Sequence, residues 1–168
     1  MNIGFIGLGI MGAPMAGHLM AGGHQIITCI HKTPAPKTLI ESGLEVVENA
    51  KEVAKNSEII IVMVPDTPQV QDVLFNQNGI AEGLTDGKLI IDMSSISPIE
   101  TKEFANTIKS RGCGYLDAPV SGGELGAKAA SLTIMVGGSE EDFSRALPIL
   151  ELMGSNITLV GENGVGQT

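Results

Sequence analysis

Three glycines near the start of the chain have the spacing of a phosphate-binding turn. They follow an apolar run over residues 2–6 and precede a helical pattern of apolar residues. In such a strand, turn and helix, Gly7 permits the tight turn, Gly9 lets the backbone approach a pyrophosphate, and Gly12 lets the helix pack close to the strand. The helix start adds free N–H groups and the positive end of the helix dipole. The predicted binding residues are Gly7, Leu8, Gly9, Ile10, Met11 and Gly12.

The segment after the second predicted strand bears on which dinucleotide binds. An NAD-selective site usually has an acid about twenty residues past the glycines, where the carboxylate binds the ribose hydroxyls. No acid lies between Gly12 and Ile40. Lys32, together with His31, is instead placed to pair with a 2′-phosphate. The sequence therefore favours NADP over NAD, with the alternative that Lys32 is only a solvated loop charge.

Two further strand ends carry candidate cofactor residues, because ligands of an open α/β sheet lie beyond the carboxyl ends of its strands. Val64 and Pro65 end the fourth predicted strand and are expected to present their backbone to the cleft. Asp66 is expected to cap the next helix. Ser94 and Ser95 follow the fifth strand, near the expected nicotinamide ribose, although either hydroxyl is equally compatible with an ordinary loop.

The end of the sixth predicted strand carries a serine followed by two glycines, Ser121, Gly122 and Gly123. Backbone N–H groups beside a hydroxyl bind a carboxylate or a developing oxyanion, so the sequence predicts a substrate-binding site here. A plain loop is the alternative. No histidine follows Ser121 in the chain, so nothing indicates its use as a nucleophile.

Short apolar runs alternate with helical patterns almost to the end of the chain. This alternation predicts an α/β, Rossmann-like, doubly wound and mostly parallel sheet with helices on both faces. Ser97 and Ser139 are predicted helix caps, and Gly154 is a predicted helix stop. The predicted strands cover residues 2–6, 25–30, 45–47, 59–64, 88–92, 114–117, 132–136 and 157–160.

Composition excludes several classes of protein. The 168 residues suit one domain, and the net charge of −9 argues against nucleic acid or an anionic membrane as a partner. No apolar run is long enough to span a bilayer, and no basic leader is present, so we expect a cytoplasmic protein. Cys29 and Cys113 lie in apolar runs without a C-x-x-C motif and are expected to be reduced and buried. No histidine pair has metal-ligand spacing, so no metal site is predicted.

The glycine turn and the serine-glycine segment together give the chain its resemblance to the β-hydroxyacid dehydrogenase family. Residues 5–16 with His18 match that family's N-terminal signature, and residues 117–123 with Ala127 match its substrate-binding segment. The resemblance implies hydride transfer between NAD(P)H and a small hydroxy acid or semialdehyde. It also implies a dinucleotide-binding domain over residues 1–162 and, over 163–168, the start of a connection to a helical domain that closes the cleft and forms a homo-oligomer.

The same resemblance implies that the catalytic lysine lies beyond Thr168, so no catalytic residue is expected within residues 1–168. A non-catalytic dinucleotide-binding module is the alternative. One position departs from the family pattern, since Ala130 stands where glycine is common. If the backbone there needs a positive φ, Ala130 is strained by on the order of 1 kcal/mol.

Overall fold

The computed structural model describes residues 1–30 and 34–168, and within them nine strands form a single sheet. The strands are β1 (Asn2–Ile6), β2 (Gln25–Cys29), β3 (Glu45–Val47), β4 (Ile59–Val62), β5 (Leu89–Asp92), β6 (Gly114–Asp117), β7 (Val120–Ser121), β8 (Leu132–Gly137) and β9 (Gly154–Gly161). The helices are α1 (Gly12–Ala21), α2 (Lys37–Glu41), α3 (Ala50–Lys55), α4 (Thr67–Phe75), α5 (Ile80–Gly83), α6 (Pro98–Lys109), α7 (Gly123–Ala129) and α8 (Glu140–Leu150).

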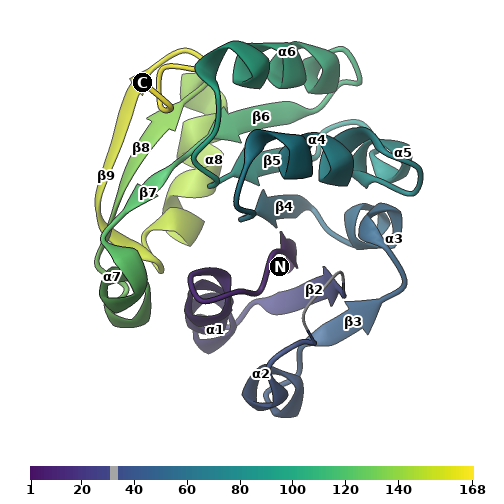
Figure 1. Ribbon diagram of the computed structural model, residues 1–168, viewed down its shortest axis with the longest axis vertical. Helices are drawn as coiled ribbons and strands as arrows, with labels where there is room; N and C mark the ends of the chain where they lie inside the picture. The colour runs from purple at the N-terminus through teal and green to yellow at the C-terminus, as the bar shows by residue number, and fades with distance from the viewer. Residues whose placement is uncertain (31–33) are drawn as a thin grey trace.

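The strand order is β3-β2-β1-β4-β5-β6-β8-β7, with β9 paired to β8 (Figure 1). All neighbours from β3 to β6 are parallel, whereas β8 runs antiparallel to β6 and β7. The predicted Rossmann-like, mostly parallel sheet is therefore confirmed. Because helices connect the parallel strands, the carboxyl ends of β1, β2, β4 and β5 meet at one edge of the sheet.

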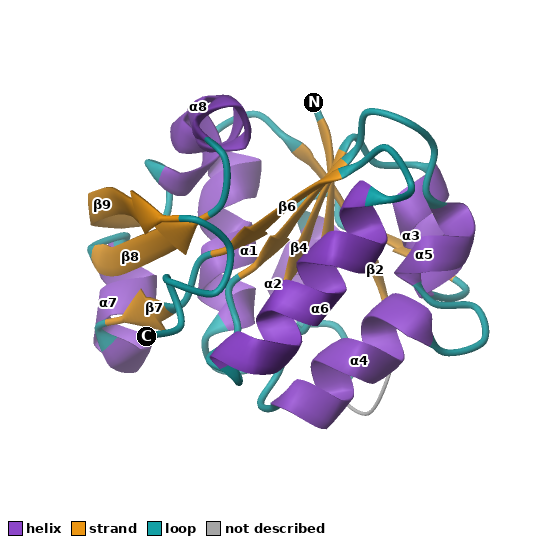
Figure 2. Ribbon diagram, turned by 90° about the horizontal axis from the view of Figure 1, so that it is seen from above, coloured by secondary structure: helices purple, strands orange, loops and turns teal. Residues whose placement is uncertain are grey.

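Successive residues of the central strands pack into two separate hydrophobic clusters, one on each face of the sheet. In β4, Ile59 and Ile61 belong to the cluster that includes α1 and α8, while Ile60 and Val62 belong to the cluster that includes α4 and α6. Figure 2 shows these helix pairs on opposite sides of the sheet. Side chains alternate along a strand, so a continuous apolar run such as this one is buried on both faces.

Three predicted helix caps are present. The side chains of Asp66, Ser97 and Ser139 accept hydrogen bonds from the backbone N–H three residues later, at 3.0, 3.4 and 3.1 Å respectively. The first two caps start α4 and α6 shortly after β4 and β5, which keeps the loops at these strand ends short.

Two details differ from the sequence prediction. Gly154 was expected to stop a helix, but α8 ends at Leu150 and Gly154 is the first residue of β9. A Cβ at Gly154 would lie 2.6 Å from the carbonyl oxygen of Leu132, so glycine permits the close approach of β9 to β8. The two-residue strand β7 was not predicted at all.

In the part of the chain that the structure describes, no helix is both long and apolar enough to cross a bilayer.

Candidate functional site

The glycine turn joins β1 to α1, and its three glycines have different surroundings. Gly7 has a φ of +107°, and a Cβ there would overlap the carbonyl oxygen of Met63. A Cβ at Gly12 would overlap the carbonyl oxygen of Gly7, whereas a Cβ at Gly9 would meet no atom of the described residues within 4 Å. The fold itself therefore requires Gly7 and Gly12, while the space beside Gly9 is open for a ligand.

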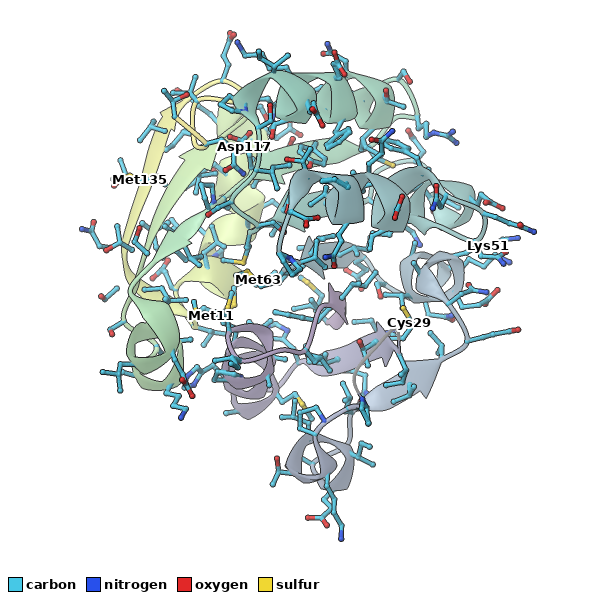
Figure 3. The ribbon with its side chains drawn as sticks, in the orientation of Figure 1. Met11, Cys29, Lys51, Met63, Asp117 and Met135 are labelled. Carbon is cyan, nitrogen blue, oxygen red and sulfur yellow. The ribbon has the colours of Figure 1, made fainter. Side chains whose placement is uncertain are left out.

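A cavity of about 850 Å³ lies beside this turn. Its wall is formed by the turn, the ends of β2 and β4, the start of α3, and one side of α4 with the loop after it. Figure 3 labels three of its side chains, Met11 of the turn, Cys29 of β2 and Met63 after β4. The volume lies within the range of small-molecule and cofactor sites.

Most of the predicted cofactor residues lie around this cavity. Ser95 does not line it, and its side chain is exposed. His31 and Lys32 lie outside the described residues. The predicted residues in the cavity wall are Gly7, Leu8, Gly9, Ile10, Met11, Gly12, Val64 and Pro65.

Seven polar residues of the cavity wall were not predicted from the sequence: Glu48, Asn49, Gln69, Asp72, Asn76, Gln77 and Asn78. Gln69, Asp72 and Asn76 follow one another by three and four residues, which places them on one side of α4 and its C-terminal end. This spacing was readable in the sequence, but not the fact that this side faces a cavity. Glu48 reaches the wall from the end of β3, which pairs with β2. A carboxylate therefore reaches the cavity from the end of the neighbouring strand, although no acid lies between Gly12 and Ile40.

The loop after β5 supports the loop after β4 through a buried serine. The backbone N–H of Val64 donates to Oγ of Ser94 at 2.9 Å, and the N–H of Ser94 donates to Oδ1 of Asp92 at 3.0 Å. Ser94 is buried while Ser95 is exposed. The two serines thus differ, because the Ser94 hydroxyl is used within the protein and the Ser95 hydroxyl is free to face a ligand.

The predicted substrate-binding residues, Ser121 to Gly123, lie outside the cavity wall, at the start of α7. Ser121 is in β7 and pairs with Thr133 of β8, and Gly122 and Gly123 have φ values of +133° and +62°. All three residues are exposed. Gly122 and Gly123 thus adopt backbone conformations that favour glycine, and pairing of β7 with β8 fixes the backbone of Ser121.

A histidine connects this segment to the glycine-turn helix. The Nε2 atom of His18 in α1 lies 2.9 Å from the carbonyl oxygens of both Ala127 and Lys128, at the end of α7, and donates its hydrogen bond to them. These carbonyls belong to the last turn of a helix, where helical partners are missing. His18 therefore fixes α7 against the helix that follows the glycine turn.

Ala130, the residue after α7, has a positive φ, the case in which strain was expected. Ala130 is left-handed, with φ 55° and ψ 38°. Such a backbone is favourable for glycine and costly for alanine. The strain lies at the far end of α7 from Gly122 and Gly123.

Two acidic side chains, Asp92 and Asp117, are buried at the carboxyl ends of β5 and β6. Burial raises the pKa of Asp92 to about 6, although hydrogen bonds from Ser94 and Tyr115 oppose the shift. Burial also raises the pKa of Asp117, against hydrogen bonds from Gly164, Asn163 and Gly166. Both carboxyls accept hydrogen bonds from protein groups, and neither residue lines the cavity.

The cysteines are free and have different surroundings. Cys29 is half-buried and lines the cavity, and Cys113 is buried. Burial raises the pKa of both thiols, which disfavours the reactive thiolate. Among residues 1–30 and 34–168, no group of three or more His, Cys, Asp or Glu side chains is arranged to hold a metal ion.

Comparison with known proteins gives a consistent result. Residues 2–161 match the family model described as the NAD binding domain of 6-phosphogluconate dehydrogenase. The 2-hydroxy-3-oxopropionate reductase of Escherichia coli K12 is 56% identical over 169 residues, which cover 100% of this chain and 57% of that protein.

Two solved structures superpose closely. The 3-hydroxyisobutyrate dehydrogenase of Mycobacterium tuberculosis, solved with L-serine, has a TM-score of 0.91 and 37% identity, covering 99% of this chain and 56% of that one. Psf3 in complex with NADP⁺ and 2-OPP has a TM-score of 0.92 and 28% identity, covering 98% of this chain and 58% of that one. The chain thus spans less than two thirds of the length of these relatives.

Proposed function

The chain belongs to the β-hydroxyacid dehydrogenase family, in which it corresponds to the NAD-binding domain, and from this premise we propose that it serves a tartronate semialdehyde (2-hydroxy-3-oxopropionate) reductase. The observation that carries the binding function is the open space beside Gly9, next to a cavity of about 850 Å³. Among residues 1–30 and 34–168, no atom lies within 4 Å of a Cβ added at Gly9. The choice of substrate is supported by the 56% identity to the Escherichia coli enzyme.

In the proposed reaction the nicotinamide cofactor supplies or accepts the hydride, and the residues of this chain bind and orient. The N–H groups of the glycine turn, at the positive end of α1, hold the pyrophosphate. Val64, Pro65 and Ser95 position the nicotinamide end of the cofactor. Ser121, Gly122 and Gly123 grip the carboxylate or hydroxyl of the substrate. The family resemblance places the proton-donating lysine after Thr168, so residues 1–168 bind cofactor without completing the reaction.

We propose NADP as the preferred cofactor, with NAD as the alternative. The absence of an acid between Gly12 and Ile40, and the presence of Lys32, support NADP. The carboxylate of Glu48 in the cavity wall is the observation that favours NAD, because a carboxylate repels a 2′-phosphate and binds ribose hydroxyls.

The cofactor proposal is tested by thermal unfolding of the 168-residue polypeptide with NADPH and, separately, with NADH. Both cofactors are expected to raise the Tm, because they bind the folded state, and NADPH is expected to raise it more at equal concentration. Reductase activity is expected to stay at background. A larger shift with NADH overturns the NADP preference, no shift with either overturns the binding site, and robust turnover overturns the placement of the proton donor.

The second candidate activity is that of a 3-hydroxyisobutyrate dehydrogenase, favoured by the close superposition on the Mycobacterium tuberculosis enzyme. The protein encoded by the complete reading frame containing residues 1–168 is to be assayed with tartronate semialdehyde and with 3-hydroxyisobutyrate. A higher kcat/KM for tartronate semialdehyde is expected. If the frame encodes no further lysine-bearing helix, the alternative of a non-catalytic binding module is preferred.

We also propose a homo-oligomer in the cytoplasm, acting on a small hydroxy acid or semialdehyde without nucleic acid or membrane partners. The net charge of −9 supports the exclusion of polyanionic partners. The free thiols of Cys29 and Cys113 suit a reducing compartment. Sedimentation velocity on the complete protein, and fractionation of cells that express it, test the two statements separately.

A further inference from the structure

The side-chain amide of Gln167 binds the backbone on both sides of Ser95. Its Nε2–H donates to the carbonyl oxygen of Ser94 at 2.7 Å, and its Oε1 accepts from the N–H of Ile96 at 3.0 Å. Ser94 and Ile96 are buried, whereas Ser95 between them is exposed. One amide group thus fixes the backbone that carries the Ser95 hydroxyl.

Gln167 is itself held in place by the end of β6. The carboxylate of Asp117 accepts hydrogen bonds from the N–H groups of Gly164 at 2.9 Å and Gly166 at 3.0 Å. The side-chain amide of Asn163 donates to the carbonyl oxygen of Tyr115 at 2.7 Å. Residues 163–166 are therefore attached to the end of β6. The side chain of the next residue, Gln167, reaches across to the loop after β5. Figure 3 shows Asp117 beside this C-terminal segment.

The other side of the same loop is attached to the cavity wall. Oγ of Ser94 accepts the hydrogen bond from the N–H of Val64, a residue of that wall. A Cβ at Gly166 would lie 2.7 Å from Oδ2 of Asp117 and 2.8 Å from the carbonyl oxygen of Met135, so the segment that carries Gln167 packs tightly. The backbone from Ser94 to Ile96 is thus held between Val64 and Gln167, which fixes the direction of the Cα–Cβ bond of Ser95.

We propose that Gln167 is a positioning residue that directs the Ser95 hydroxyl to the nicotinamide end of the bound cofactor. This proposal rests on the proposed function, which assigns Ser95 to that end. The proposed function assigns the pyrophosphate to the glycine turn and the adenosine to the end of β2, and Gln167 makes no hydrogen bond with either among the described residues. Gln167 should therefore affect binding of the complete dinucleotide and leave binding of its ADP-ribose part unchanged.

The test compares two pairs of ligands on wild type and three variants of the 168-residue polypeptide by isothermal titration calorimetry. The ligands are NADP⁺ and 2′-phospho-ADP-ribose, which lacks nicotinamide, with NAD⁺ and ADP-ribose as a second pair. Gln167→Met keeps the size of the side chain and removes both hydrogen bonds, whereas Gln167→Glu keeps the acceptor for Ile96. Gln25→Met is the matched control, because Gln25 also donates to a backbone carbonyl, that of Gly43 at 3.0 Å, at the start of β2.

Gln167→Met is expected to weaken binding of NADP⁺ about fivefold and to leave the affinity for 2′-phospho-ADP-ribose within about twofold of wild type. Gln167→Glu should weaken binding of NADP⁺ at least as much as Gln167→Met, because its carboxylate places an acceptor against the Ser94 carbonyl oxygen. Gln25→Met should change neither affinity. Equal losses for both ligands, or no loss for NADP⁺, overturn the role of Gln167. A wild-type polypeptide that binds neither ligand pair overturns the proposed function instead.

Discussion

Asp92 and Asp117 are directly paired in the register between β5 and β6, and both residues have 0% exposure. Their carboxyls are satisfied in different ways. Asp92 accepts from the N–H of Ser94 and, at 3.1 Å, from the hydroxyl of Tyr115, a group that can also accept a hydrogen bond. Asp117 accepts from the backbone N–H groups of Gly164 and Gly166, which can only donate. Replacing each acid by its amide should therefore have different consequences.

Asp92→Asn is expected to remove a pH dependence of stability. Burial raises the Asp92 pKa from 3.8 to about 6, so the folded protein binds this proton more tightly than the unfolded chain. The wild type consequently loses stability as the pH rises through this range and stays penalised above it, by about 3 kcal/mol. The asparagine can accept from Ser94 and donate to the Tyr115 hydroxyl without a charge.

Urea unfolding of both proteins at pH 4, 5, 6 and 7 checks this expectation. The free energy of unfolding of Asp92→Asn, relative to wild type, should rise between pH 4 and pH 6 and then level off. Titrations of groups that do not interact with Asp92 cancel in this difference. A difference that is constant with pH would contradict the raised pKa.

Asp117→Asn should loosen the C-terminal segment, because the amide N–H₂ must face one of two backbone donors. One N–H, of Gly164 or Gly166, is then left without an acceptor. Hydrogen exchange of these two amides is expected to accelerate at least about fivefold, as loss of a buried hydrogen bond predicts. NMR-detected exchange gives the rates, and Asp92→Asn is the control that should leave them unchanged. Unaltered exchange in Asp117→Asn would show that the segment is held by other contacts.

Gly9→Ala and Gly12→Ala should separate cofactor binding from folding. The Cβ of Gly9→Ala enters open space, so the free energy of unfolding should change by less than about 0.5 kcal/mol, while the rise in Tm with NADPH is lost. The Cβ of Gly12→Ala would overlap the Gly7 carbonyl, which is expected to cost about 2 kcal/mol or more. Thermal unfolding with and without NADPH measures both quantities. If Gly9→Ala keeps its response to NADPH, the pyrophosphate does not approach Gly9.

Ala130→Gly should stabilise the protein, because it relieves the left-handed backbone at the end of α7. The expected gain is about 1 kcal/mol in the free energy of unfolding. Ala129→Gly is the matched control, since Ala129 is the last residue of α7 and glycine in a helix should cost about 1 kcal/mol at most. Urea unfolding at neutral pH compares the two variants. Equal effects of the two substitutions would argue against strain at Ala130.

The strands of the sheet interior were predictable because each is a short apolar run buried on both faces, as Ile59–Val62 shows. The two-residue strand β7 carries no such run, since it exists only through its pairing with β8. The serines after β5 were also indistinguishable in sequence. Only the tertiary structure places the Ser94 hydroxyl against the N–H of Val64 and leaves Ser95 exposed.

The sequence by itself determined the family, the doubly wound sheet and the glycine turn. Apolar strand runs, helix caps and the glycine that a positive φ requires are patterns of residues close together in the chain, so they can be recognised without the structure. Only the tertiary structure decided which groups surround the cavity and which acids are buried. Glu48, Asp72 and Gln167 lie far from the glycine turn in sequence, and their places depend on how strands and helices pack. Such contacts leave no local pattern in the chain, so they were read from the structure alone.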